Sequence, residues 1–170
     1  LELVLGKDAR VNRRVEARHA PDRPAAVSTA DDELFASVPS EMRFELGEDA
    51  EADEVEPNDV PERAQTLAWP CVVNGDLSAE GGRDRYRFSG KKGDALYVDV
   101  RAEALGSPLK ALLTVRDAQG QPVASGVYDT GTALGSALCG RDPSVALTLP
   151  ADGAYEAEVA DADGRAGAEF

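Results

Sequence analysis

The sequence predicts an all-β protein, an antiparallel β-sandwich of jelly-roll-like character. Between residues 84 and 159, apolar and polar side chains alternate in short runs, which is the period of a strand with one buried face. Gly, Asn and Asp concentrate between the runs, where tight turns need them. Strands at intervals of about 8 to 12 residues with such turns are typical of antiparallel sandwiches and barrels. The chain has no alternating helical pattern, which disfavours a parallel α/β sheet.

Five runs carry this alternation, and in the first of them Asp84, Tyr86 and Phe88 share one face. We expect turns at residues 74–76, 81–82, 91–94, 117–121 and 150–153. The core positions expected from the other four runs are Leu96, Val98 and Val100; Leu109, Ala111, Leu113 and Val115; Val145, Leu147 and Leu149; and Tyr155, Ala157 and Val159.

The first 48 residues differ from the rest in composition. Their apolar residues occur only in short pieces, which are too sparse for a separate core; residues 42–46 alternate like a strand, and residues 31–35 are expected to open a short helix. We interpret residues 1–48 as the C-terminal remnant of a preceding β domain together with a connector.

A boundary follows, because residues 45–62 contain nine carboxylates and no Lys or Arg, and like charges resist packing. We therefore predict an acidic linker over residues 49–59. The sandwich is predicted over residues 60–170, with its last strand truncated at Phe170.

Composition and charge exclude several functions. With 32 acidic and 18 basic residues the net charge is −14, whereas a nucleic-acid-binding surface needs clustered Lys and Arg. No window approaches the roughly 18 consecutive apolar residues of a membrane span. The single histidine, His19, lies outside the predicted sandwich, which therefore lacks the proton carrier of Ser–His–Asp or Cys–His catalysis. We expect no nucleic-acid partner, no membrane span in this segment and no enzymatic activity.

Residues 54–59 form the densest group of oxygen-bearing side chains. In an extended chain Glu54, Glu56 and Asn58 project to the same side, and Asp59 follows at the turn. Since Ca²⁺ takes six to eight oxygen ligands, this segment would supply about half of a coordination shell. Asp84 is the first candidate for the remainder, and Asp76 with the carbonyls of residues 74–75 a weaker one. A solvated acidic linker without metal explains the same residues.

Eight short motifs follow one another along the chain: residues 54–59 (EVEPND), 64–65 (AQ), 73–75 (VNG), 84–88 (DRYRF), 93–94 (GD), 105–109 (LGSPL), 117–120 (DAQG) and 149–155 (LPADGAY). In this order they resemble bacterial pre-peptidase C-terminal domains, and the fold and acidic opening are similar to those of the collagen-binding domains of clostridial collagenases. The resemblance spans residues 54–170.

This resemblance implies a non-catalytic accessory β-sandwich of a secreted, periplasmic or cell-envelope bacterial protein, a spacer or stabiliser beside a catalytic or envelope domain of the same polypeptide. It also implies Ca²⁺ as a cofactor, with five ligand residues carried over: Glu54, Glu56, Asn58, Asp59 and Asp84. Gly82 stands where relatives have another Asp, and the loss of one carboxylate is expected to weaken binding, to leave part of the shell to water, or to limit the site to one ion where relatives hold two.

Two further features leave alternatives open. Cys71 and Cys139, separated by 67 residues, form a disulfide in an exported protein or remain two buried thiols. Trp69 and Tyr97 are not assigned to the core, and flat rings on a sheet face bind sugars or extended peptides. A polysaccharide- or protein-binding module for adhesion or substrate targeting is therefore the alternative function, although Trp69 also suits the edge of the core.

Overall fold

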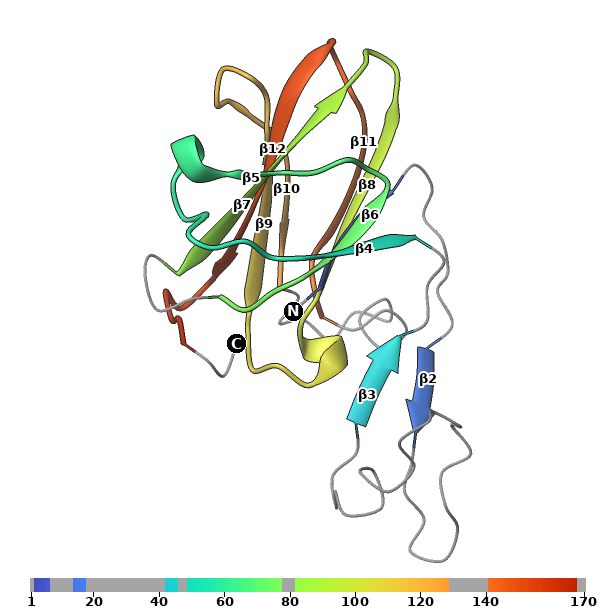
Figure 1. The fold of residues 1–170 in the computed structure, drawn as a ribbon, viewed down its shortest axis with the longest axis vertical. Helices are drawn as coiled ribbons and strands as arrows, with labels where there is room; N and C mark the ends of the chain where they lie inside the picture. The colour runs from blue at the N-terminus through green and yellow to red at the C-terminus, as the bar shows by residue number, and fades with distance from the viewer. Residues whose placement is uncertain are drawn as a thin grey trace, which may run out of the picture. The chain divides into compact units, whose positions relative to one another are not determined.

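The computed structural model describes residues 2–6, 14–17, 42–45, 49–77, 82–128 and 141–167. The chain divides into two compact units, one of Leu1–Arg10 with Asp49–Phe170 and one of Val11–Glu48. In the smaller unit, strands β2 (Arg14–Ala17) and β3 (Met42–Glu45) pair antiparallel, and β3 confirms the strand predicted at residues 42–46. The larger unit is an all-β sandwich, which confirms the predicted fold class (Figure 1).

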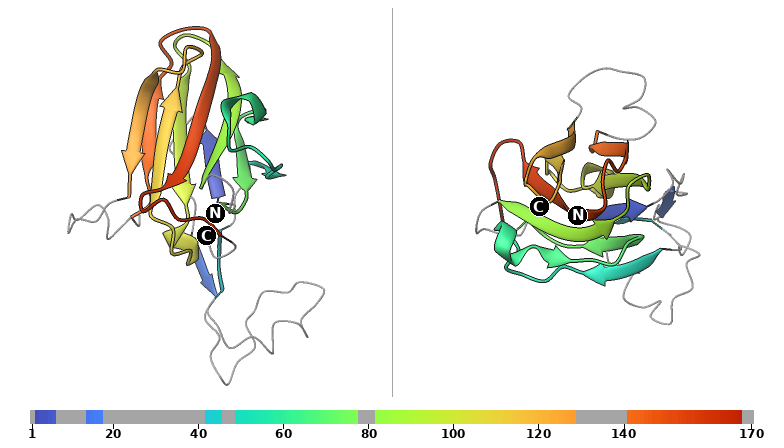
Figure 2. Two further views of the ribbon diagram at one scale, coloured as in Figure 1. Left: turned by 90° about the vertical axis from the view of Figure 1, so that its left-hand side faces the viewer. Right: turned by 90° about the horizontal axis from the view of Figure 1, so that it is seen from above.

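Two five-stranded sheets form the layers of this sandwich, as Figure 2 shows. The first sheet contains, in spatial order, β11 (Ser144–Thr148), β8 (Ala95–Arg101), β1 (Glu2–Gly6), β6 (Cys71–Asn74) and β4 (Ala50–Asp53). The second contains β10 (Pro122–Val127), β9 (Ala111–Arg116), β12 (Gly153–Asp161), β7 (Arg83–Gly90) and β5 (Gln65–Thr66). Two short 3₁₀ helices are η1 (Pro61–Arg63) and η2 (Glu103–Leu105).

Most strand pairings in the two sheets are antiparallel, as predicted, and two at the sheet edges are parallel. β4 pairs parallel with β6, β5 pairs parallel with β7, and the other pairings in the two sheets are antiparallel. Only antiparallel strands can be joined by a tight hairpin. β4 and β5 are instead short edge strands on either side of a crossing between the sheets, so their direction is not set by a hairpin with a neighbour.

The core lies between the sheets and contains nearly all the apolar residues that the alternation predicted, with Leu147 only partly buried. It also contains residues that the alternation did not predict, among them Leu3, Leu67 and Leu77. In β8 and β9 every second side chain is buried, as expected for strands with one face turned inward. In β7 and β12 the same alternate positions are buried, and Arg85, Glu156 and Glu158 on the opposite face are buried as well. The largest side chains that are almost fully enclosed are Tyr86, Phe88, Leu3, Leu77, Leu96, Leu109, Leu113 and Leu149.

Strand β1 corrects the interpretation of residues 1–48 as part of a preceding domain. It lies between β8 and β6 and pairs with both, so that Leu3 is opposite Val100 on one side and Val73 on the other. Leu3 is 1% exposed and belongs to the sandwich core. Both partner strands are distant in sequence, so no local pattern could reveal this pairing.

Other predictions for the ends of the domains differ in outcome. Residues 50–53 of the predicted linker form β4, an edge strand of the sandwich. The predicted helix at residues 31–35, His19 and the truncated strand at Phe170 lie outside the described residues, and β12 ends at Asp161. Within the described part of the chain, no helix has the length and hydropathy needed to cross a membrane.

Candidate metal site

The candidate site lies where the chain crosses from the first sheet to the second. After β4, residues 54–64 lead to β5 at the edge of the other sheet (Figure 1). The N–H of Glu54 donates to the carbonyl oxygen of Asn74 at 2.8 Å, which extends the pairing with the end of β6. This segment, residues 54–64, is called the crossing. It closes one edge of the sandwich and brings its acidic residues next to the start of β7.

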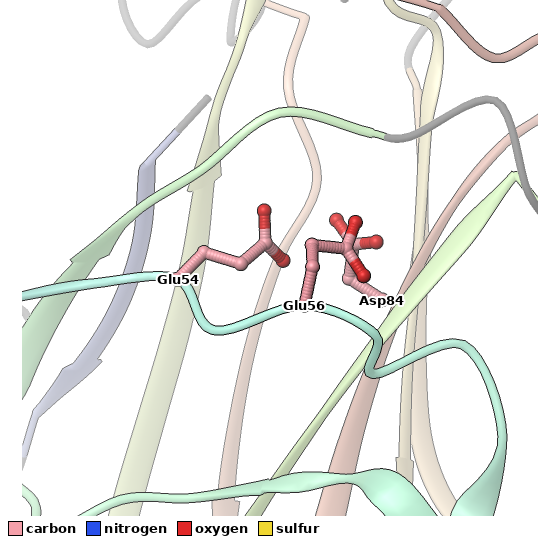
Figure 3. Close-up of side chains that lie close together, drawn as sticks. All are labelled: Glu54, Glu56 and Asp84. Atoms are coloured by element: carbon pink, nitrogen blue, oxygen red, sulfur yellow. The ribbon is translucent and has the colours of Figure 1, made fainter.

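Three carboxylates meet there, those of Glu54, Glu56 and Asp84 (Figure 3). Each offers an oxygen that lies within 4.8 Å of the others. Glu54 and Glu56 come from the crossing, whereas Asp84 lies on the inward face of β7 with Tyr86 and Phe88. Carboxylates that are distant in sequence therefore lie close together, and the role of these residues as metal ligands stays a prediction.

Asp84 is the most deeply enclosed of the three. It is 1% exposed, and neither of its carboxylate oxygens accepts a hydrogen bond from the described residues. Burial, followed by the negative charges of Glu54 and Glu56, raises the pKa of Asp84 to about 8. A buried carboxylate is normally paired or hydrogen-bonded, so Asp84 keeps its proton at neutral pH unless a cation compensates its charge.

Asn58 ties the two glutamates together. Its Nδ2 donates to Glu54 Oε1 at 2.6 Å, and its backbone N–H donates to Glu56 Oε2 at 3.0 Å. The side chain is 0% exposed, and its Oδ1 accepts no hydrogen bond from the described residues. An amide carbonyl oxygen is a normal Ca²⁺ ligand, so Asn58 suits the role that the sequence assigned to it.

Glu54 is held more firmly than its neighbours. Besides the amide of Asn58, the hydroxyl of Tyr86 donates to Oε1 at 2.6 Å and the N–H of Asp76 donates to Oε2 at 3.0 Å. Gly75 leaves room for this carboxylate, because a Cβ atom at that position would overlap Glu54 Oε2. Burial, with the charges of Asp84 and Glu54, raises the pKa of the Tyr86 hydroxyl, which therefore stays a donor.

Asp59 and Asp76 play different parts from the three clustered carboxylates. Asp59 is not one of the three residues whose carboxylates meet; its backbone oxygen accepts a hydrogen bond from Arg85 Nε at 3.3 Å, and its Oδ1 is buried without a donor among the described residues. Asp76 supplies its N–H to Glu54, and its charge adds to the raised pKa of Asp84. Both stay predictions as ligands.

Gly82 explains a departure from the resemblance. It has φ +59°, in the left-handed region that favours glycine, and a Cβ atom there would lie 3.3 Å from the carbonyl oxygen of Arg165. An aspartate at this position would be strained. The local backbone therefore agrees with a site built without that carboxylate.

Two residues at the site were not predicted as functional, Gln65 and Tyr86. Tyr86 shares a face with Asp84 by simple alternation, which is a signal that the sequence offers. Gln65 contacts the backbone on both sides of Glu54 from β5. It belongs to the motif at residues 64–65, which assigned it no role at the site.

The chemistry of the donors fits a hard divalent cation. The group offers carboxylate and amide oxygens, without nitrogen or sulfur, which is the set that Ca²⁺ prefers. Within the described ranges, no Lys or Arg forms an ion pair with Glu54, Glu56 or Asp84.

The remaining sequence candidates lie elsewhere. Cys71 is a buried thiol on β6, and burial, with the charge of Asp49, raises its pKa; Cys139 lies outside the described residues, so the disulfide stays a prediction. Trp69 packs edge-on against Phe88 with ring centroids 5.9 Å apart and donates from Nε1 to the carbonyl of Ser89 at 2.6 Å.

Trp69 thus covers the edge of the core, the second of the two roles considered for it. Tyr97 alternates with the buried Leu96 and Val98 on β8 and is half-buried on the outer side of the first sheet. The two rings belong to different elements, and a ligand-binding face stays a prediction.

Comparison with known proteins shows a likeness to a bacterial protease. Over 112 residues the chain is 33% identical to a probable subtilase-type serine protease of Deinococcus radiodurans, an alignment that covers 63% of this chain and 14% of that protein. The alignment thus spans only a small part of the length of that protease. No family model matches the chain, and the resemblance to pre-peptidase C-terminal domains stays a prediction.

Proposed function

We propose that this chain is a non-catalytic accessory β-sandwich of an exported bacterial protein, stabilised by a calcium ion at Glu54, Glu56, Asn58 and Asp84. The likeness to a segment of a subtilase-type serine protease supports a role beside a peptidase or another hydrolase in one polypeptide. The all-β architecture supports a compact spacer or stabiliser.

One observation carries the calcium proposal. Asp84 is 1% exposed, faces two further carboxylates, and has two oxygens without a hydrogen-bond donor among the described residues. Asn58, 0% exposed, adds an amide oxygen in the same condition. An unpaired buried charge is strongly unfavourable, and a divalent cation bound by these oxygens removes that cost.

The ion would act by neutralising repulsion at the crossing. Without it, the negative charges of Glu54, Glu56 and Asp84 oppose the approach of the crossing to β7. With it, the same oxygens attract a common centre, so the crossing is fixed between the two sheets. Because only the folded state assembles the ligands, binding stabilises the fold by about 2.7 kcal/mol at a free ion concentration 100 times Kd.

An extracellular location suits such a site. Extracellular modules bind Ca²⁺ with Kd values of roughly 0.1 to 1 mM, and we expect this range here because Glu56 is exposed. Calcium in the medium would then keep the domain loaded after export.

The test is calcium titration of the chelator-treated 170-residue chain by calorimetry, together with thermal unfolding at several Ca²⁺ concentrations. We expect measurable heat and a rise in Tm that Asp84→Asn and Glu56→Gln both reduce. Glu62→Gln is the matched control, since it removes an exposed carboxylate from the same segment outside the clustered group. Absence of both heat and thermal shift in the unmodified chain at millimolar Ca²⁺ would overturn the metal proposal.

The non-catalytic role has its own test. The chain alone should not hydrolyse casein with or without Ca²⁺, and hydrolysis that survives purification and is lost on substitution of a carboxylate in this chain would contradict the accessory role.

A further inference from the structure

We propose that Gln65 and Tyr86 are positioning residues of the calcium site, which bind no ion themselves but hold the Glu54 carboxylate where one of its lone pairs can be a ligand. This inference rests on the proposed function. It adds that two residues of the second sheet help to set the calcium affinity of the site. Glu54 itself follows β4, which is a strand of the first sheet.

Gln65 fixes the backbone on both sides of Glu54. Its Oε1 accepts from the N–H of Val55 at 2.9 Å, and its Nε2 donates to the carbonyl oxygen of Asp53 at 3.0 Å. The side-chain amide therefore pairs with the crossing as a neighbouring strand would. Since the residues on either side of Glu54 are anchored, the direction of the Glu54 side chain is fixed.

Tyr86 fixes the carboxylate itself. Its hydroxyl donates to Glu54 Oε1 at 2.6 Å, and its ring is buried in the core at 1% exposure, so the donor cannot move far. Gln65 on β5 is the register partner of Tyr86 on β7. Two neighbouring positions of the second sheet thus hold Glu54, one through its backbone and one through its side chain.

The number of donors defines what remains for an ion. A carboxylate has about four lone-pair sites. Glu54 uses three of them for Tyr86, Asn58 and the N–H of Asp76, which leaves one for a cation. Asp84 uses none among the described residues. The geometry therefore predicts a single-oxygen contact from Glu54 and a more extensive contact from Asp84.

The donors also counteract repulsion. Before an ion binds, the charges of Glu56 and Asp84 push the Glu54 carboxylate away from the cluster. Loss of either positioning residue lets Glu54 turn toward solvent, so that the ion must pull it back or bind water in its place. Residues that orient a metal ligand typically change affinity by 10- to 100-fold, and we expect roughly a tenfold loss for each.

The experiment uses the whole 170-residue chain with Gln65→Met, which keeps the length of the side chain, and Tyr86→Phe, which keeps the ring. Calcium affinity is measured by calorimetry. Tb³⁺, a luminescent substitute for Ca²⁺, reports bound water through its decay rates in H₂O and D₂O. Gln119→Met, at an exposed turn, and Tyr155→Phe, whose hydroxyl bonds the backbone of Ala151, are the matched controls.

Weaker Ca²⁺ binding with additional water on Tb³⁺ in both variants, and neither change in the controls, is the expected result. Unchanged affinity, or weaker affinity with unchanged hydration, overturns the positioning roles while leaving the calcium site intact. If the unmodified chain binds neither ion, the proposed function fails and this inference fails with it. Because hydration is measured on the folded, loaded chain at low temperature, a lower Tm in a variant does not obscure the outcome.

Discussion

The two faces of strand β7 treat buried charge in opposite ways. Asp84 and Arg85 are consecutive residues, both less than a tenth exposed, and they point to opposite sides of the strand. On the inner side Asp84 meets Glu54 and Glu56, which share its sign. On the outer side Arg85 forms ion pairs with Glu156, at 2.6 Å, and with Glu158. The protein supplies counter-charge on one face, while the other face is suited to a cation from solution.

Arg85, Glu156 and Glu158 form an outer cluster, which is also connected to the crossing. The N–H and Nε of Arg85 donate to the carbonyl oxygens of Asn58, at 3.1 Å, and Asp59, at 3.3 Å, and Arg87 donates to that of Pro61 at 2.6 Å. One stretch of chain therefore contacts both faces of β7. On the outer side its carbonyl oxygens accept hydrogen bonds from arginines, whereas on the inner side oxygens of Asn58 and Asp84 have no donor among the described residues.

The largest effect should come from removing the outer counter-charge. Arg85→Met leaves Glu156 and Glu158, each 7% exposed, without their main partner, and we expect a loss of roughly 3 to 5 kcal/mol in the free energy of unfolding. Urea denaturation in a calcium-free buffer measures it. A loss below about 1 kcal/mol would mean that the two faces do not differ in this way.

On the inner face the opposite sign is expected. Asp84→Asn removes a carboxyl that the folded ion-free protein must keep protonated at a pH where the unfolded chain ionises it, and should stabilise the ion-free protein by about 3 kcal/mol at pH 7. The folded-state pKa of Asp84 is raised to about 8, so the folded protein favours the protonated carboxyl. The free energy of unfolding that this preference contributes is fully present below about pH 4, the unfolded-state pKa, and is lost as pH rises through 8. Urea titrations of the ion-free protein between pH 4 and 9 should show this decline, and Asp84→Asn should not.

Asp161 sharpens the comparison, since it is a buried aspartate with protein donors. Burial opposes its ionisation, but the side chain of Arg165 and the backbone N–H groups of Lys110, Arg165 and Asp163 outweigh this and lower its pKa to about 2. Ionised Asp161 therefore adds on the order of 2 kcal/mol to the free energy of unfolding. This stabilisation is present above the unfolded-state pKa and is lost as pH falls from about 4 through 2.

Acid denaturation followed by circular dichroism tests this. Asp161→Asn should lower stability at pH 6 and flatten the dependence on pH below 4. A variant that unfolds at the same urea concentration as the unmodified chain at pH 6 would show that the donors contribute little.

The smallest effect is expected at the rim of the outer cluster. The side chain of Arg83 is half exposed, and its Nη1 lies 3.7 Å from Glu158 Oε2. Arg83→Met should therefore change the free energy of unfolding by less than about 1 kcal/mol. It is the matched control for Arg85→Met, because it removes the same charge from the same strand. An equal loss from both variants would show that net charge, rather than burial, determines the effect.

Much of the fold could be predicted because alternation is a local property. The buried rows of β7, β8, β9 and β12 follow from residues two apart, and the turns follow from Gly, Asn and Asp. β10 was not predicted, because its sequence, PVASGV, contains small residues with weak contrast between faces. The central place of β1 was missed since strand pairing depends on distant partners.

For the candidate site, the sequence by itself determined that the oxygen-bearing side chains of residues 54–59 are gathered in one short segment. It also determined that Asp84 shares a face with Tyr86. Only the tertiary structure decided that these two segments meet, that Asp59 contributes its backbone to Arg85, and that Gln65 holds the chain around Glu54. The reason is physical: side-chain direction along a strand is a local property of the backbone, whereas the meeting of two strands depends on how the whole core packs.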